Sequence, residues 1–279
     1  QNKYLRRRNM DWSILKDPGV WGVFVAAVAL ILSQFPPISD LIKGVKIKIT
    51  VPGQFTLYHF IGNIQIYLLI GIHNIGGRSV SISRLECFIT DDQRHIWHLP
   101  AQTYTSRQQS YQSNVLQEFL LGLISLKPGE QWNEAVRCCR LWSETEEEKA
   151  NEIISQVTKS ISSKCPSANS QIQVEADEKP VGEAISFFEK LFDLHKGNFK
   201  FFIAALSEDN SVLAVRSFDF TLFESNINVL RSHTDQYKYG YGIYSPVSDW
   251  TKYVVVRLRT IPDDKRTLET YEKLRAGVG

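Results

Sequence analysis

The sequence has only four cysteines among its 279 residues, and their positions fit neither a disulfide framework nor a zinc site. Cys138 and Cys139 are adjacent, whereas Cys87 and Cys165 lie far from them along the chain. Disulfide frameworks and structural zinc ions both need cysteines at short, regular spacings. Thiols without such a pattern favour a reducing compartment such as the cytoplasm.

The sequence also lacks the short motifs of common catalytic families. It has no phosphate-binding GxxxxGK[ST] loop, no dinucleotide-binding glycine fingerprint and no GxSxG turn for a nucleophilic serine. His95 and His98 are three residues apart, but a strand would point these side chains to opposite faces. We therefore predict no catalytic residues, no metal and no cofactor, and we expect that the protein is not an enzyme.

The chain has little net charge, but the charge is unevenly distributed. A formal net charge of +2 is too small to indicate a nucleic-acid-binding protein by itself. Residues 1–50 contain eight Lys or Arg and three Asp, whereas the rest of the chain has three more acidic than basic residues. A basic and apolar N-terminal part before an acidic body favours contact with anionic lipid headgroups.

One stretch has no charged residue at all, from Gly19 to Ile38. As a helix it would be about 30 Å long, which matches the hydrocarbon core of a bilayer. Asp17 and Pro18 are typical of a helix N-terminus, and the dipeptide Pro36-Pro37 would end the helix. We predict a membrane span over about residues 18–37, with a buried helix of a soluble protein as the alternative.

Small residues follow one face of this predicted helix. They are Gly22, Ala26, Ala29 and Ser33, at spacings of four, three and four. Small side chains let helices approach closely in lipid, where burial of apolar surface gives no driving force. Ser33 and Gln34 would offer polar groups to a central path or to a hydrogen bond between helices. We predict a homo-oligomer with this seam; the alternative is that Gly and Ala are simply common in membrane spans.

The rest of the chain, residues 41–279, is predicted to form one β-rich domain. Residues 45–51 alternate between apolar and polar, and residues 64–72 are continuously apolar. The glycines at 76–77 and the SEDN stretch at 207–210 each predict a hairpin between their flanking strands. Short strands separated by turns favour an antiparallel β-sandwich of immunoglobulin-like type.

Helical patterns interrupt the strands. Residues 143–161 begin with a capping box formed by Ser143 and Glu146, and residues 181–196 are amphipathic. We predict a helical insertion over about residues 143–196 and a last surface helix within residues 263–277. The predicted fold class is thus a membrane-anchored α+β protein, in which the N-terminal part is residues 1–40.

Tyrosines and lysines are concentrated between Tyr237 and Tyr253. Exposed aromatic rings stack on nucleobases, and cations offset phosphate charge. The alternatives are packing against another subunit or within the core. The residues that we predict to bind a nucleotide or single-stranded DNA are Tyr237, Lys238, Tyr239, Tyr241, Tyr244, Lys252, Arg257 and Arg259.

Two segments, GVWGVFVAAVALILSQFPPI (19–38) and HFIGNIQIYLLIGIHNIGGRSVSI (59–82), resemble a group of bacterial proteins with one N-terminal span and a β-rich body. The resemblance covers about the first ninety residues. In outline it is similar to membrane effectors of anti-phage defence, such as the Hailong-type effector, an ion channel held shut by a short DNA signal. No functional motif matches residue by residue, so the resemblance implies a cytoplasmic sensing body and no particular site.

The side of the membrane on which the body lies is open at this point. Five basic residues precede the predicted span and three follow it, which places the N-terminus in the cytoplasm and the body outside. The cysteines and the resemblance instead favour a single-pass protein of the bacterial inner membrane with its body in the cytoplasm.

Two functional hypotheses follow from these patterns. The first is a homo-oligomeric membrane effector, a gated channel or membrane-perturbing protein whose body senses a nucleotide or single-stranded DNA. The second is a membrane-anchored interaction module without a pore.

Overall fold

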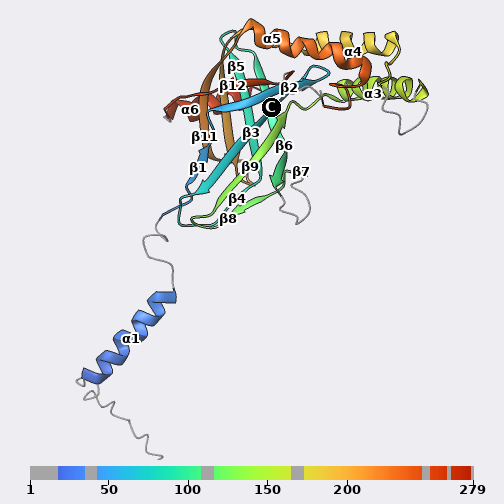
Figure 1. The fold of residues 1–279 in the computed structure, drawn as a ribbon. Helices are drawn as coiled ribbons and strands as arrows, with labels where there is room; N and C mark the ends of the chain where they lie inside the picture. Colours follow the sequence, from blue (N-terminus) through green and yellow to red (C-terminus); the bar gives the residue numbers. More distant parts are fainter. Residues whose placement is uncertain are drawn as a thin grey trace, which may run out of the picture.

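The computed structural model describes residues 18–34, 43–107, 116–164, 173–246, 252–262 and 265–277. Most of them belong to a barrel-like sheet of eleven strands with helices at one end, while an apolar helix precedes the sheet (Figure 1). The strands are β1 (Ile47–Thr50), β2 (Gln54–Phe60), β3 (Asn63–Asn74), β5 (Arg84–Asp91), β6 (Ile96–Arg107), β7 (Leu116–Leu120), β9 (Gln131–Cys139), β10 (Gly197–Leu206), β11 (Val212–Leu222), β12 (Val254–Arg257) and β13 (Arg259–Thr260).

A two-stranded sheet and six helical segments complete the described part. The small sheet pairs β4 (Val80–Ile82) with β8 (Ile124–Leu126). The helices are α1 (Pro18–Gln34), α3 (Glu144–Lys164), α4 (Glu178–Leu191), α5 (Glu224–Arg231), the 3-10 helix η2 (Ser232–Tyr239) and α6 (Lys265–Ala276).

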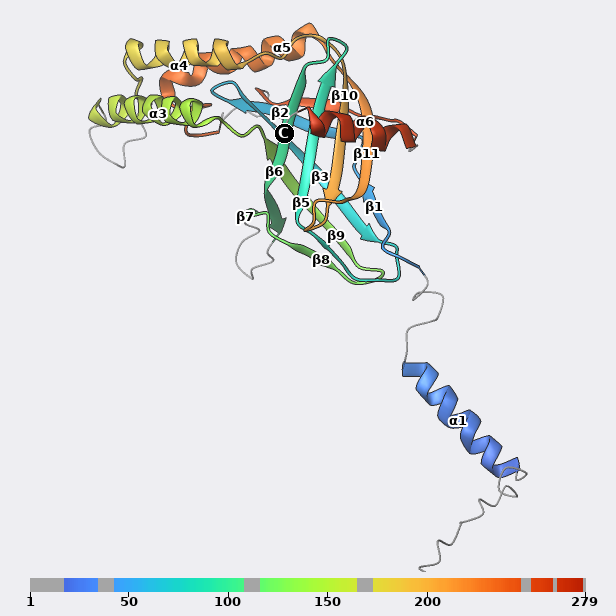
Figure 2. The same cartoon turned by 180° about the vertical axis from the view of Figure 1, so that it is seen from behind.

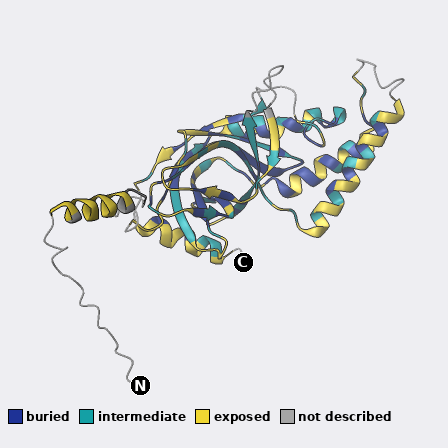
Figure 3. Cartoon of the chain, turned by 90° about the horizontal axis from the view of Figure 1, so that it is seen from below, coloured by how far each residue is buried: buried dark blue, intermediate teal, exposed yellow. Residues whose placement is uncertain are grey.

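The large sheet curls until its two ends meet in one stretch of chain. Its pairing order is β12-β2-β3-β9-β6-β5-β10-β11-β13, with β1 beside β3 and β7 beside β6. β12 pairs with β2 at one end, β13 pairs with β11 at the other, and only Leu258 separates β12 from β13. This short segment therefore joins the two ends of the sheet, and the nearly closed ring is seen end-on in Figure 3.

The antiparallel, β-rich body is confirmed, but the predicted immunoglobulin-like sandwich is wrong. Alternation along a strand shows which side chains face a core and does not show which strands pair, so it fits a sandwich and a barrel equally. The hairpin predicted at residues 76–77 does not form, because β3 pairs with β1, β2 and β9 while β4 pairs with β8. The hairpin predicted at residues 207–210 is confirmed as β10 and β11.

Apolar side chains from all parts of the sheet fill the barrel. In β3 the inward positions are occupied by branched aliphatic residues, all buried: Ile64, Ile66, Leu68, Ile70 and Ile72. β10 and β11 contribute aromatic rings, and the rings of Phe199 and Phe220 stack at 5.2 Å. Burying each of these side chains contributes roughly 1.5–3 kcal/mol, so the interior is a packed core.

Helices α3, α4 and α5 lie at one end of the barrel (Figure 2), and η2 packs against α4 and α5 there. The predicted helical insertion is confirmed as α3 and α4. The capping box at the start of α3 is confirmed as well: the backbone N–H of Glu146 donates to Ser143 Oγ at 3.4 Å, and the N–H of Ser143 donates to Glu146 Oε2 at 2.9 Å. Phe188 of α4 and Phe192, which directly follows α4, are buried in the same core as the barrel strands.

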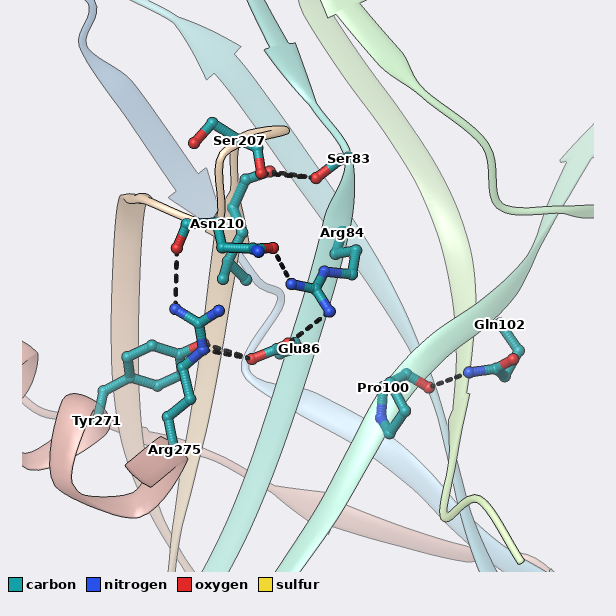
Figure 4. Close-up of polar contacts among 10 residues, drawn as sticks. Ser83, Arg84, Glu86, Pro100, Gln102, Ser207, Asn210, Tyr271 and Arg275 are labelled. Atoms are coloured by element: carbon teal, nitrogen blue, oxygen red, sulfur yellow. Dashed lines mark hydrogen bonds and ion pairs between the residues drawn. The ribbon is translucent and has the colours of Figure 1, made fainter. Parts of the chain in front are cut away.

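The predicted C-terminal helix is α6, which lies on the outer face of β5 and β10. Its Tyr271 packs with Phe88 and Phe202 in a small separate core. Tyr271 also donates a hydrogen bond to Glu86 Oε2 at 2.7 Å, and Arg275 approaches the same carboxylate at 3.8 Å (Figure 4). A buried carboxylate with a donor and a nearby cation thus holds α6 in place.

α1 is a 17-residue helix whose described side chains are all exposed. Among the described residues, no helix is both long enough and apolar enough to cross a bilayer, so the predicted span is not confirmed. Gly22, Ala26 and Ala29 lie on exposed positions of α1. The side chains of Ser33 and Gln34, and the basic residues before residue 18, lie outside the described part.

Candidate ligand-binding groove

The residues predicted to bind a ligand do not meet in one pocket. Tyr237 is fully buried under α4, with its ring edge-on to Phe188 at 6.3 Å. Lys238 and Tyr239 both contact Glu175: Lys238 Nζ lies 2.5 Å from Glu175 Oε1, and the Tyr239 hydroxyl donates to the same oxygen at 2.8 Å. Tyr237 therefore points into the core, whereas Lys238 and Tyr239 both point toward Glu175 at the surface.

The other predicted residues lie further along the chain. Tyr241 and Tyr244 belong to the turn after η2, where Gly240 has φ +80° and a Cβ would come within 2.3 Å of the Tyr244 ring. Only glycine fits this position without displacing Tyr244. Lys252 Nζ donates to Ser232 Oγ at 2.6 Å. Arg257 and Arg259 are exposed on either side of the buried Leu258.

A groove lies nearby, on the outer face of the barrel where β2, β3 and β9 run side by side. Its volume is about 370 Å³. The residues that line it are Thr56, Tyr58, Phe60, Tyr67, Thr105, Glu118, Arg137, Pro246 and Tyr253. The tyrosine-rich stretch therefore contributes its last residue, Tyr253, to a site that is built mainly from other strands.

Strand alternation explains why these side chains share one face. In β2 the positions of Phe55, Leu57 and His59 point into the core, so Thr56, Tyr58 and Phe60 point outward. The outward-facing side chains continue onto the two neighbouring strands, because Thr56 lies opposite Tyr67 in β3 and Tyr67 lies opposite Arg137 in β9. Cross-strand neighbours of this kind are close enough to form a continuous wall.

Aromatic rings form one wall of the groove. The Tyr58 ring lies edge-on to Tyr253 at 5.5 Å and to Phe60 at 6.0 Å. Burial raises the pKa of Tyr58 far above its ordinary value, and the positive charge of Arg137 offsets only part of this rise. Burial also raises the pKa of Tyr253. Both phenols are therefore uncharged at neutral pH. Both rings offer stacking surface to a ligand, and Tyr58 adds a hydroxyl group.

Arg137 is the cation of the groove. Its Nε lies 2.8 Å from Glu118 Oε1 and donates to Thr103 Oγ1 at 3.2 Å. Both of these contacts use Nε, so among the described residues the two Nη groups remain available to an anion. The side chain is 31% exposed, which leaves it reachable from solvent while its direction is fixed.

The cysteines next to Arg137 do not add a nucleophile. Burial raises the pKa of Cys139, and the positive charge of Arg137 does not compensate for it. Burial and the neighbouring thiol of Cys87 raise the pKa of Cys138 as well. Both side chains are therefore thiols at neutral pH, and thiols react much more slowly than thiolates. Among the described residues, no group of His, Cys, Asp and Glu is arranged to hold a metal ion.

The groove combines three features that suit one planar, anionic ligand. Ring surface allows stacking, the guanidinium of Arg137 binds phosphate or carboxylate, and hydroxyl groups can fix orientation. A volume of about 370 Å³ lies in the range of pockets that hold one small molecule. Sequence reasoning missed these residues, although Tyr58 and Phe60 at the outward positions of an alternating strand were a usable signal.

Comparison with known proteins gives no further guidance, since no protein-family model matches the chain and no curated protein matches its sequence.

Proposed function

We propose that this protein is a homo-oligomeric membrane effector whose barrel domain binds a nucleotide-type signal in the groove around Arg137. The groove is the observation that supports this most directly, because it places aromatic ring surface beside a fixed guanidinium. A nucleotide presents the complementary pair, a planar base and a phosphate. The groove is large enough for a single nucleotide, either free or at the end of a short single strand.

The exposed apolar surface of α1 supports attachment to a membrane. Large side chains such as Trp21, Phe24 and Leu30 are all more than half exposed. Leaving such surface in water costs about 25 cal/mol per Å², so lipid or other copies of the helix are expected to cover it. The uncharged run of the sequence continues to Ile38, beyond the last residue of α1.

In this proposal the inner membrane of a bacterium holds the N-terminal segment, and the barrel lies in the cytoplasm. Copies associate through the face that carries Gly22, Ala26 and Ala29, and the assembly opens a path or perturbs the bilayer. The nucleotide controls this step only if it binds more tightly to one state of the assembly than to the other.

Ligand binding is tested by calorimetric titration of the purified full chain with mononucleotides and short oligonucleotides. We expect saturable binding that the variants Arg137→Met and Tyr58→Leu each weaken at least about tenfold, since each removes a main contact. Arg257→Gln is the control, because it also removes one arginine but lies outside the groove. Unchanged affinity in Arg137→Met would overturn the assignment of the groove.

Effector activity is tested with dye-loaded vesicles of anionic lipid that carry the full chain. Dye release that responds to the nucleotide supports the effector. Association with the vesicles without release under any ligand condition would instead indicate the alternative function, a membrane-anchored interaction module without pore activity.

A further inference from the structure

We name helices α3, α4, α5 and η2 the helical cap. The opposite end of the barrel, which we name the basal end, is built from three chain segments, residues 43–46, 74–78 and 126–130. Backbone hydrogen bonds join them: Gly77 N–H donates to the Lys43 carbonyl at 3.1 Å, and Gly129 N–H donates to the Asn74 carbonyl at 2.8 Å. The side chain of Asn74 adds bonds to the carbonyls of Arg78 and Leu126. The basal end is therefore one continuous surface (Figures 1 and 2).

This surface is strongly basic. Its three segments contain the basic residues Lys43, Lys46, Arg78 and Lys127 and a single acidic residue, Glu130. All four basic side chains are exposed. Within the described parts of the chain, Lys46, Arg78 and Lys127 form no ion pair with a carboxylate. Their charge is thus available to an external anionic partner, although the chain as a whole is nearly neutral.

Exposed apolar side chains lie among these cations. Val45 and Ile75 belong to the basal end itself, and both are exposed. Leu120 and Leu123, which are 83% and 57% exposed, line an adjoining groove of about 630 Å³ that also contains Trp132. Large apolar side chains next to lysines are typical of surfaces that lie in the headgroup region of a membrane.

The chain connection keeps the basal end close to α1. β1 begins at Ile47 in this end of the barrel, and residues 35–42 separate α1 from Lys43. Eight residues reach at most about 30 Å when fully extended. If α1 is held in lipid, the basal end therefore cannot be farther than this from the place where the chain leaves α1.

We propose that the basal end binds the anionic headgroup surface of the membrane that holds α1. Lys46, Arg78 and Lys127 contact lipid phosphates, and Leu120 and Leu123 enter the interface between headgroups and acyl chains. The helical cap then points away from the membrane. This inference rests on the membrane attachment in the proposed function, and it adds a second contact that orients the barrel.

Lysine footprinting of the full chain tests this contact. The protein is reconstituted into vesicles of phosphatidylcholine, or of phosphatidylcholine and phosphatidylglycerol in equal parts, and an amine-acetylating reagent is added. We expect Lys46 and Lys127 to be protected only in the vesicles with phosphatidylglycerol. Lys179 and Lys190, which are exposed on the helical cap, provide the internal control and should react equally in both.

Flotation of the same samples separates the two hypotheses. Protein that floats with both vesicles but has basal lysines as reactive as the cap lysines would overturn the lipid contact and leave membrane attachment intact. Protein that floats with neither would refute membrane attachment, and this inference with it. Protection that rises with protein concentration, independently of phosphatidylglycerol, would assign the surface to a second copy and also overturn the proposal.

Three double variants, one of which is a control, locate the contact further. In Arg78→Gln with Lys127→Gln, the protection of Lys46 should fall about fivefold for each cation removed, which corresponds to ~1 kcal/mol each. Leu120→Ser with Leu123→Ser should reduce protection as well. Lys179→Gln with Lys190→Gln removes the same charge from the cap and should change nothing. All of these side chains are exposed, so the barrel core is left intact.

Discussion

His59 and His233 stack on each other where the barrel meets its helical cap, with ring centroids 4.5 Å apart and both side chains buried. His59 Nδ1 accepts a hydrogen bond from the Gly62 N–H at 3.2 Å, so the ring proton lies on Nε2, which donates to the Leu230 carbonyl at 2.9 Å. His233 Nε2 donates to the Lys252 carbonyl at 2.6 Å. The junction therefore contains two neutral imidazoles.

Acid should loosen this junction. Burial lowers the pKa of His59 from 6.5 to about 3, with a further contribution from His233, and burial also lowers the pKa of His233. Because the folded-state pKa lies below the ordinary value, the unfolded chain binds protons first, and stability falls as the pH drops below about 6.5. We expect a loss of ~1.4 kcal/mol per pH unit from His59, with an additional loss from His233, measured by urea unfolding below pH 6.5.

A variant at one ring isolates the effect. His59→Gln keeps one donor and one acceptor but cannot take up a proton. The slope of its free energy of unfolding against pH should therefore be smaller than in the wild type, by the contribution of about one proton. His73→Gln, on the outer face of β3, is the control and should keep the wild-type dependence. If His59→Gln showed the same slope as the wild type, the stacked pair would not be the acid-sensitive element.

The tight turn between β2 and β3 gives a second prediction. Gly62 has φ +83°, and an added Cβ would lie 3.0 Å from the Phe188 carbonyl oxygen and 3.1 Å from Leu191 Cβ. Gly129 has φ +80°, but nothing lies within 4 Å of its added Cβ. Alanine at either position costs about 1 kcal/mol for the backbone conformation, and at Gly62 the clash with α4 should add roughly 1–3 kcal/mol.

Denaturant unfolding of Gly62→Ala and Gly129→Ala measures this difference directly. The excess destabilisation in Gly62→Ala reports how firmly α4 is held against the end of the hairpin. Equal losses in the two variants would show that the cap yields easily at this contact.

Local patterns made much of this fold predictable. Alternation identified the strands and their buried faces, and the pair Ser143 and Glu146 identified the start of α3, because these signals come from residues close in sequence. The closing of the barrel gave no such signal. β12 and β13 have four and two residues, and β12 pairs with β2, which lies about two hundred residues earlier in the sequence.

The groove could not be predicted from the sequence for a similar reason. Tyr58, Tyr67 and Arg137 meet only through the register of three strands, and no single segment of sequence contains that register. Composition was a weaker guide still. Tyr237 lies in the tyrosine-rich stretch from which we predicted a ligand site, yet its ring is part of the core.

The thiols inside the barrel should be inert. Cys87 Sγ and Cys138 Sγ are 3.5 Å apart, and neither side chain is exposed. We predict that alkylation of both, followed by mass spectrometry of their peptides, proceeds only as fast as the protein unfolds. Cys139 is partly exposed, and its raised pKa predicts slow labelling in the folded state. Rapid labelling of Cys138 in the native protein would contradict the packed interior.

The seam on α1 predicts a change in oligomeric state. In the single chain, no atom lies within 4 Å of a Cβ added at Gly22. A larger side chain on this face should therefore change the assembly only by altering contacts between copies. We expect Ala26→Ile to reduce the size of the assembly, measured by light scattering in detergent. Val25→Ile, on a neighbouring face of the same helix, is the control. An unchanged assembly in Ala26→Ile would remove this seam as the interface.

The ion pair in the groove gives the last prediction. Glu118 partly neutralises Arg137, since its Oε1 lies 2.8 Å from Arg137 Nε, and it also accepts a hydrogen bond from Thr103. In Glu118→Gln the amide oxygen can still orient Arg137, but the negative charge that repels a phosphate is gone. Both side chains are partly exposed, so solvent screens the effect, and we expect about fivefold tighter binding of a nucleotide, or ~1 kcal/mol.

The nucleoside without phosphate provides the decisive comparison. Its affinity should not change in Glu118→Gln, because stacking on Tyr58 and Tyr253 does not depend on this charge. Glu134→Gln removes a carboxylate from β9, the strand of Arg137, outside the groove and should leave both affinities unchanged. Tighter binding of nucleotide and nucleoside alike would place the phosphate away from Arg137. Weaker binding of the nucleotide would mean that the charge of Glu118 is needed to hold the guanidinium in its binding position.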